Sequence, residues 1–191
     1  TPLGQVPVDA AFVERLRLEP LFVDYPGASE PEHSVQIQVP LLQVALDAFA
    51  LVPIVVGRLD AQTADHMGRI LAAMVDERTL VIASSDFTHY GPRYGYIPFA
   101  PSQEDLRRLD MGAFDRIRNK DLAGFLQYCD TTGATICGRD AIAVLLAMLP
   151  PEARFEPLTE EDGAPNRMRL TYRIVEGPQF KVKKVLLGGY Q

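Results

Sequence analysis

The sequence has few cysteines, no excess of basic residues and no long apolar run. Two cysteines are too few for a disulfide scaffold, which favours a reducing, cytoplasmic setting. Because 25 acidic residues outnumber 19 basic ones, the chain carries a formal charge of -6 and lacks the concentrated basic face that binds nucleic acid. No apolar run approaches the length of a transmembrane helix, and no signal peptide is recognisable. We therefore expect neither nucleic acid nor a membrane as a partner.

Length and composition fit one α/β domain with at most a small appendage. The 191 residues are 47% hydrophobic and 23% charged, as in an ordinary globular protein. Helical and strand patterns alternate along the first 150 residues, which implies a largely parallel sheet with crossover helices. The expected helices are 10–16, a segment starting near Pro40 within 33–49, 61–75, 103–119, 121–128 and 138–149, and the expected strands are 21–24, 51–56 and 79–83.

The residues after 150 have a different character. Residues 152–165 are polar and contain Pro and Gly, as in a linker, while 168–175 and 180–187 alternate apolar and polar residues, which is typical of a β-hairpin. We therefore divide the chain into a main domain, 1–150, and a linker with a hairpin, 151–191. The hairpin either forms an appendage or adds strands to the main sheet.

The polar segment 84–91, SSDFTHYG, is the most informative part of the sequence. It directly follows the apolar run 80–83 and carries Asp86 and His89, three residues apart. Ligands of open α/β sheets collect beyond the carboxyl ends of the strands, so a carboxylate and an imidazole that leave a buried strand predict a functional site. The alternative interpretation is a turn with an Asx cap and an exposed histidine.

Cys137 is a second candidate, because it precedes the predicted helix 138–149 and lies next to Arg139. A thiol at a helix N-terminus beside a guanidinium lies in a positive field, which favours the thiolate that binds metals or attacks electrophiles. The alternative is a small side chain buried in the core. With Asp86 and His89 it would offer ligands suited to iron, copper or zinc, but only folding can bring these distant residues together.

A third candidate is the triplet Glu32, His33 and Ser34, which precedes the helical segment through Pro40. His33 has the chemistry of a general base or of a hydrogen-bond donor to a substrate. The equal alternative is that Glu32 and Ser34 cap the following turn.

Two further features are interpreted as structural. His66 lies within the predicted helix 61–75 and is expected to face solvent. The aromatic loop with Tyr94, Tyr96 and Phe99 is able to line a pocket, but we expect it to fix the loop to the core.

Three motifs together resemble the Memo family. They are EHS at 32–34 with the QIQVPL that follows Val35, SSDFTHYG at 84–91 and TICGR at 135–139, in the order and at the separations of the family. The resemblance runs from about Thr1 to about Leu149. Memo proteins resemble class III extradiol dioxygenases in fold, which implies an α/β layered sandwich around a mixed, largely parallel central sheet.

The resemblance implies a metal centre with redox chemistry. Family members are linked to iron or copper binding and to signalling through protein interactions. We therefore expect metal-dependent redox or dioxygenase-like activity on a small-molecule or peptide ligand. The expected site residues are the metal ligands Cys137 and His89, the catalytic residues His33, His89 and Asp86, and the pocket-lining residues Glu32 and Arg139.

The sequence departs from the family pattern at both ends. Two further metal-ligand histidines of the family would precede Thr1, so the resemblance places part of the ligand set outside this chain. At the other end, residues 170–188 resemble the last hairpin of a POTRA repeat, a periplasmic module of outer-membrane assembly factors. The alternative function is a binding module of the same fold that has no turnover and recognises a peptide or a small anionic ligand.

Overall fold

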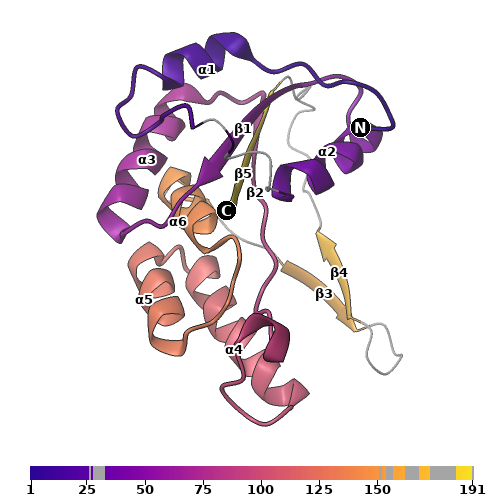
Figure 1. Ribbon diagram of the computed structural model, residues 1–191, viewed down its shortest axis with the longest axis vertical. Coiled ribbons are helices and arrows are strands. Elements are labelled where there is room, and N and C mark those ends of the chain that lie inside the picture. Colours follow the sequence, from indigo (N-terminus) through magenta and orange to yellow (C-terminus); the bar gives the residue numbers. More distant parts are fainter. Residues whose placement is uncertain are drawn as a thin grey trace.

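In the part of the chain that the structure describes, helices and strands alternate from residue 34 to residue 83, helices then follow one another up to residue 148, and the last elements are strands (Figure 1). The computed structural model describes residues 1–25, 27, 33–150 and 152–153, and the backbone alone of 157–161, 168–172 and 184–190. The helices are α1 (Ala10–Leu16), α2 (Ser34–Ala45), α3 (Ala61–Met74), α4 (Gln103–Arg118), α5 (Leu122–Thr132) and α6 (Arg139–Met148), with a 3-10 turn, η1 (Pro92–Tyr94). The strands are β1 (Ala50–Val56), β2 (Thr79–Ala83), β3 (Pro157–Glu161), β4 (Met168–Tyr172) and β5 (Lys184–Tyr190).

The main sheet has the order β1-β5-β2, and both pairings are parallel. Lys184 of β5 is in register with Ala50 of β1 on one side and with Thr79 of β2 on the other. The expectation of a parallel sheet with crossover helices is confirmed for these strands. The carboxyl ends of β1 and β2 therefore lie at the same edge of the sheet.

Helices cover both faces of this sheet. Val52 of β1 packs into the larger core with Met67 of α3 and Ile142 of α6, whereas its neighbour Leu51 packs into a smaller core with Leu42 of α2. Successive side chains of a strand point to opposite faces, so the two cores lie on opposite sides of β1. Because both faces of β1 are covered by apolar cores, its sequence is apolar almost throughout.

Most of the expected elements are confirmed, but two are wrong. The helix expected to start near Pro40 starts at Ser34 and has Pro40 in its interior, because Val35, Val39 and Leu42 pack on the smaller core from both sides of the proline.

The strand expected at 21–24 is absent. This segment has no strand pairing, and the N–H of Phe22 bonds back to Glu19 O at 2.9 Å. Phe22 packs against the larger core, while Val23 and Tyr25 are exposed. The apolar residues of this segment thus belong to a turn held by local hydrogen bonds.

The hairpin pairing expected near the end of the chain is also wrong. β4 pairs antiparallel with β3, in a region expected to be a linker, and β5 enters the main sheet instead. Alternation of apolar and polar residues identifies strands but not their partners. One of the two expected strands thus completes the main sheet, and the division of the chain at residue 150 stays a prediction.

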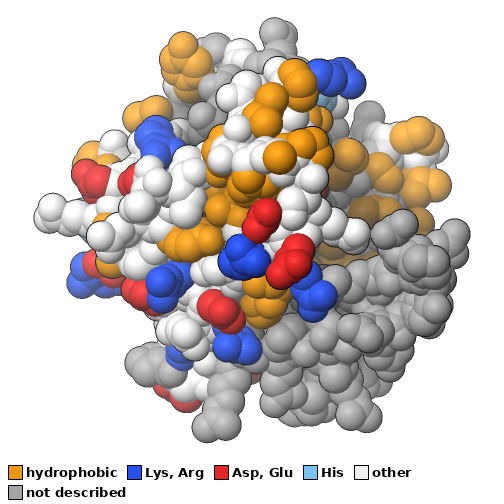
Figure 2. Space-filling model, turned by 90° about the horizontal axis from the view of Figure 1, so that it is seen from below, with side chains coloured by type: hydrophobic (Ala, Val, Ile, Leu, Met, Phe, Trp, Pro, Cys, Tyr) orange, Lys and Arg blue, Asp and Glu red, His pale blue; other side chains and the backbone are white. Residues whose placement is uncertain are grey.

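Acidic and basic side chains are interspersed on the face seen in Figure 2, with apolar side chains between them. This mixture agrees with the scattered basic residues of the sequence. No described helix is both long and apolar enough to cross a bilayer.

Candidate metal centre

The segment that follows β2 is held from two sides. Ser84, buried at the end of the strand, accepts a hydrogen bond from Gln38 Nε2 of α2 at 3.1 Å. Ser85 Oγ accepts another from the N–H of Gly138, directly before α6, at 2.9 Å. Residues far apart in the chain therefore fix the loop that carries Asp86 and His89.

Cys137 points at this loop from the start of α6. The backbone N–H of Asp86 donates to Cys137 Sγ at 3.0 Å, and Ser85 Oγ lies 3.9 Å from the same sulfur. Hydrogen bonds from N–H groups stabilise an electron-rich sulfur and tune its donor strength toward a metal. The contact gives Cys137 a defined position beside the strand end.

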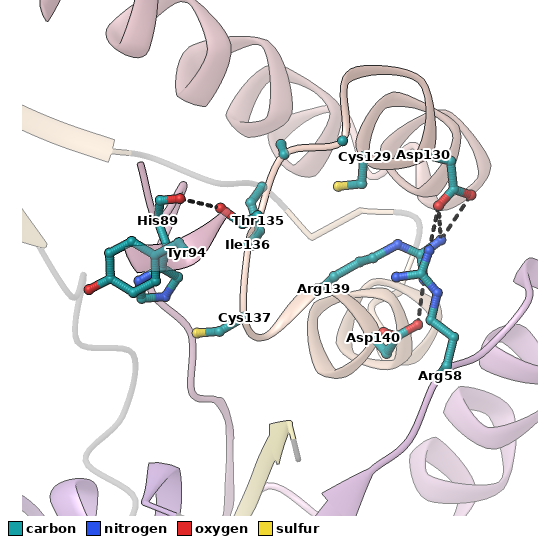
Figure 3. Close-up of a pocket in the computed structure, with 12 residues that line it drawn as sticks. Arg58, His89, Tyr94, Cys129, Asp130, Thr135, Ile136, Cys137, Arg139 and Asp140 are labelled. Carbon is teal, nitrogen blue, oxygen red and sulfur yellow. Dashed lines mark hydrogen bonds and ion pairs between the residues drawn. The ribbon is translucent and has the colours of Figure 1, made fainter. Parts of the chain in front are cut away.

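His89 is fixed by Thr135, two residues before the cysteine. Thr135 Oγ1 donates to the carbonyl of His89 at 2.7 Å, and the N–H of His89 donates to Thr135 O at 3.5 Å. The imidazole packs against the ring of Tyr94, with 4.9 Å between centroids and 43° between the planes. Hydrogen bonds thus join the segment that carries the imidazole of His89 to the segment that carries the thiol of Cys137 (Figure 3).

Asp86, His89 and Cys137 form one cluster. One ligand atom from each of them lies within 4.8 Å of the other two. Asp86 is exposed, while the other two side chains are half-buried, so the cluster opens to solvent on the aspartate side. The structure therefore brings together the residues that the two sequence motifs supplied separately.

The cluster borders a cavity of about 550 Å³, which Cys137 and His89 line. Apolar walls come from Ile136, Ala134 and the ring of Tyr94. A group of charged side chains lies at the other end, around Arg139 (Figure 3). A cavity of this size is typical of small-molecule sites, which are mostly apolar with a few placed polar groups.

The charged end is built on Arg139, which is only 5% exposed. Its Nη1 donates to Asp140 Oδ1 at 2.5 Å, and its Nη2 lies 3.0 and 3.1 Å from the two oxygens of Asp130. Asp130 Oδ1 also accepts from Arg58 Nη2 at 2.6 Å. Asp140 receives a further bond from the N–H of Leu59 at 3.0 Å, which ties this end to the loop after β1.

The two cysteines differ in environment although both border the cavity. Cys129 of α5 is 4% exposed, and burial raises the pKa of its thiol to about 11, a shift that the nearby Arg139 only partly offsets. Cys129 therefore stays protonated at neutral pH and is a poor metal ligand. Cys137, half-buried and bonded to Asp86, is the candidate ligand of the pair.

The other predicted site residues fall elsewhere. His33 is exposed at the start of α2, with Nδ1 at 3.3 Å from Gln36 Oε1, and is not part of the cluster or the cavity lining. Its catalytic role stays a prediction, and Glu32 lies outside the described residues. Arg139 lines the cavity, and its role in a functional pocket stays a prediction. His66 is exposed, as expected.

The sequence analysis gave no site role to Arg58, Asp130 and Asp140, which line the charged end of the cavity, and it did not choose the pocket role that it considered for the loop with Tyr94. Tyr94 belongs to the aromatic loop that we expected to pack on the core, and it is 55% exposed. Arg58 follows the apolar strand β1 just as Asp86 follows β2, so the same strand-end argument would have indicated it. Asp130 carries no such signal, because it lies on the solvent-facing side of a helix.

Comparisons with known proteins agree with the motifs. A family model described as Memo-like protein matches residues 1–158. A protein memo-1 homolog of Caenorhabditis elegans is 33% identical over 156 residues, which are 76% of this chain and 44% of that protein. A MEMO1 family protein of Archaeoglobus fulgidus is 36% identical over 151 residues, which are 76% of this chain and 53% of that protein. The chain thus spans about half the length of the curated relatives it matches.

Proposed function

Because the chain belongs to the Memo-like protein family, we propose that Asp86, His89 and Cys137 hold a redox-active metal, iron or copper, in a site for redox or dioxygenase-like chemistry. The observation that carries the proposal is the convergence of three different ligand atoms within 4.8 Å. A layered α/β sandwich like that of class III extradiol dioxygenases is part of the same proposal.

The donor set suits such a metal. Thiolate sulfur and imidazole nitrogen are ligands of iron, copper and zinc, and a carboxylate completes the mixed sets found in many redox and hydrolytic sites. Donor atoms about 2.0–2.3 Å from a tetrahedral ion lie roughly 3.5 Å from one another, which small side-chain rotations reach from the present arrangement. When bound, the metal would supply electron transfer and activation of dioxygen.

The residues of this chain then have separate tasks. The N–H of Asp86 holds the sulfur in place, and Thr135 fixes the backbone of His89. The Tyr94 ring packs against the imidazole and limits its rotation. The exposed carboxylate of Asp86 is placed to orient a ligand or to accept a proton from it. His33 remains a predicted proton acceptor for which no contact with the cluster is described.

Metal content tests the proposal. The protein and its Cys137→Ser and His89→Asn variants are incubated anaerobically with ferrous iron or cuprous copper, desalted and analysed for bound metal. Both variants are expected to lose most of the metal, because each loses one of three donors. His66→Asn is the matched control, since His66 is exposed on α3 and away from the cluster. Unchanged metal content in Cys137→Ser would refute the assignment.

A binding role without turnover is the second candidate, and the cavity of about 550 Å³ favours it. In that case a small anionic ligand or a peptide binds while the metal-loaded protein consumes no dioxygen. Oxygen uptake of the loaded protein, measured with and without ligand, separates the two functions. The metal role requires the free thiol of Cys137, and a reducing, cytoplasmic compartment is part of that proposal.

A further inference from the structure

The charged end of the cavity has the chemistry of an anchor for a ligand. We propose that Arg58 and Arg139 bind the carboxylate of a small organic acid with an apolar body, and that Asp130 occupies this position in its absence. This inference rests on the proposed function, because it assigns a ligand class to the cavity beside the metal cluster.

Arg139 already holds a carboxylate here. Its Nη2 lies 3.0 and 3.1 Å from the two oxygens of Asp130, while its Nη1 is used by Asp140. Hydrogen bonds from a guanidinium nitrogen to a carboxylate are charge-assisted and strong. Because Nη1 of the buried Arg139 is held by Asp140 and by the carbonyl of Leu59, the guanidinium cannot swing away and Nη2 stays available for a carboxylate.

Arg58, from the loop after β1, is the second cation of the anchor. Its side chain is 62% exposed and gives one hydrogen bond, from Nη2 to Asp130 Oδ1 at 2.6 Å. In the part of the chain that the structure describes, its other donors have no partner. Asp130 itself is 52% exposed near the end of α5, so it can rotate into water when another carboxylate takes its place.

The charges favour an anion in that position. When Asp130 turns outward, Asp140 still balances Arg139, but the charge of Arg58 is left unbalanced. The N-terminal end of α6 also borders the cavity, and its N-cap, Gly138, provides no side-chain acceptor. Exposed helix N-termini attract negative charge, so both features act in the same direction.

The walls between the anchor and the metal cluster define the rest of the ligand. Ile136 and Ala134 line the cavity, and the ring of Tyr94 stands beside His89. An aromatic or aliphatic body would pack there, with its far end toward Cys137 and His89 (Figure 3). The ligand class is therefore a small monocarboxylic acid with an apolar body.

Binding of benzoate tests this, with neutral benzamide and with phenyl phosphate as comparisons, each titrated into the protein and followed by ligand-observed NMR. Benzoate is expected to bind at least about tenfold more tightly than benzamide, as for one lost charge-assisted hydrogen bond. Equal binding of benzoate and benzamide overturns the proposal. Binding of phenyl phosphate alone overturns the choice of a carboxylate.

Variants locate the binding. Arg58→Gln is expected to weaken benzoate about tenfold, whereas Arg69→Gln, an equal charge change at an exposed arginine on α3, leaves it unchanged. Asp130→Asn removes the internal competitor and is expected to strengthen benzoate binding severalfold. Unchanged affinity in Arg58→Gln overturns the proposal, and this exposed position decides the question even if Asp130→Asn fails to fold.

The metal proposal and the carboxylate proposal fail separately. Cys137→Ser, measured without added metal, is expected to keep its benzoate affinity while it loses metal. Arg58→Gln is expected to keep its metal content while its affinity for benzoate falls about tenfold. Loss of benzoate binding in Cys137→Ser but not in Arg58→Gln would move the carboxylate to the metal cluster and overturn the anchor.

Discussion

A methyl group on Gly138 would come within 2.4 Å of Ser85 Cβ and 2.5 Å of Ser84 O. The backbone at residue 138 can therefore approach Ser84 and Ser85 this closely only because glycine has no side chain. This approach allows the N–H of Gly138 to reach Ser85 Oγ, and it brings the neighbouring Cys137 to Asp86. The cluster of Asp86, His89 and Cys137 thus depends on a contact that none of these three side chains makes.

Gly138→Ala is expected to destabilise the protein by about 1–3 kcal/mol, as for an overpacked interior position, and to lower metal uptake by separating Cys137 from Asp86. Urea unfolding and metal analysis give the two readouts. Gly57→Ala is the control, since a Cβ at Gly57 meets nothing within 4 Å. A fully stable Gly138→Ala variant with normal metal content would contradict the packing argument.

Asp140→Ala is expected to cost about 3–5 kcal/mol in the free energy of unfolding, because it removes the buried carboxylate that pairs with Arg139 Nη1 and accepts from the Leu59 N–H, and leaves Arg139 only the half-exposed Asp130. Asp115→Ala, which breaks the exposed pair with Arg118, should change it by less than about 1 kcal/mol. Both are measured by urea unfolding. Equal effects at the two positions would show that the buried network contributes no more than a surface pair.

Cys129 makes stability fall at alkaline pH. The unfolded thiol loses its proton near 9.0 and the folded one near about 11, so the folded state binds more protons between these values. The free energy of unfolding therefore keeps its full value below pH 9 and falls by about 1.4 kcal/mol per unit up to 11.

When urea unfolding is measured across this pH range, the free energy of unfolding should fall less steeply with pH for Cys129→Ala than for the unchanged protein. The raised pKa values of Tyr96 and Tyr128, caused mainly by burial, act in the same direction and remain in both proteins. The difference between the slopes thus isolates the thiol. Identical slopes would mean that Cys129 ionises in the folded state as it does in the unfolded state.

Alkylation distinguishes the cysteines chemically. With limiting iodoacetamide at mildly alkaline pH, we expect one modification, at Cys137, because Cys129 is 4% exposed and its pKa is raised. Peptide mapping by mass spectrometry locates the label. Prior incubation with ferrous iron should slow the labelling of Cys137, whereas faster labelling of Cys129 would reverse the assignment of the two thiols.

A chain that ends at residue 150 is expected to lose cooperative unfolding. β1 and β2 both pair with β5, and without it their inner edges have no partner. Leu186→Pro offers a milder version, because it removes one N–H from the middle of the sheet. Thermal unfolding followed by circular dichroism tests both. A truncated chain with an unchanged Tm would show that 1–150 is an independent domain.

The cluster of Asp86, His89 and Cys137 was predictable in its parts because each part has a local signal. Asp86 and His89 follow an apolar strand, and Cys137 precedes an apolar helix, so periodicity alone places them at the ends of elements. Their meeting depends on the contact between Ser85 and Gly138, which no local pattern contains. The resemblance to a family, not the spacing, joined the motifs before the fold was known.

The charged end of the cavity and the pairing of the last strands were not predicted. From the sequence, Asp130 is an ordinary solvent-facing residue of a helix. Only the tertiary structure places it where it contacts both Arg58 and Arg139. Likewise the alternating segments 168–175 and 180–187 contain β4 and the start of β5, yet β4 pairs with β3 and β5 with the main sheet. Strands far apart in the sequence compete for the same partners, and a short stretch of sequence does not show which strand will pair with which.

The position of β5 has a consequence for biosynthesis. The strand in the middle of the sheet is translated after β1, β2 and every described helix. As the chain leaves the ribosome, β1 and β2 therefore stay without their partner until β5 has been synthesised and inserts between them. During that interval the nascent protein exposes strand edges with unpaired backbone N–H and C=O groups, so its yield in cells should depend on chaperones that bind nascent chains.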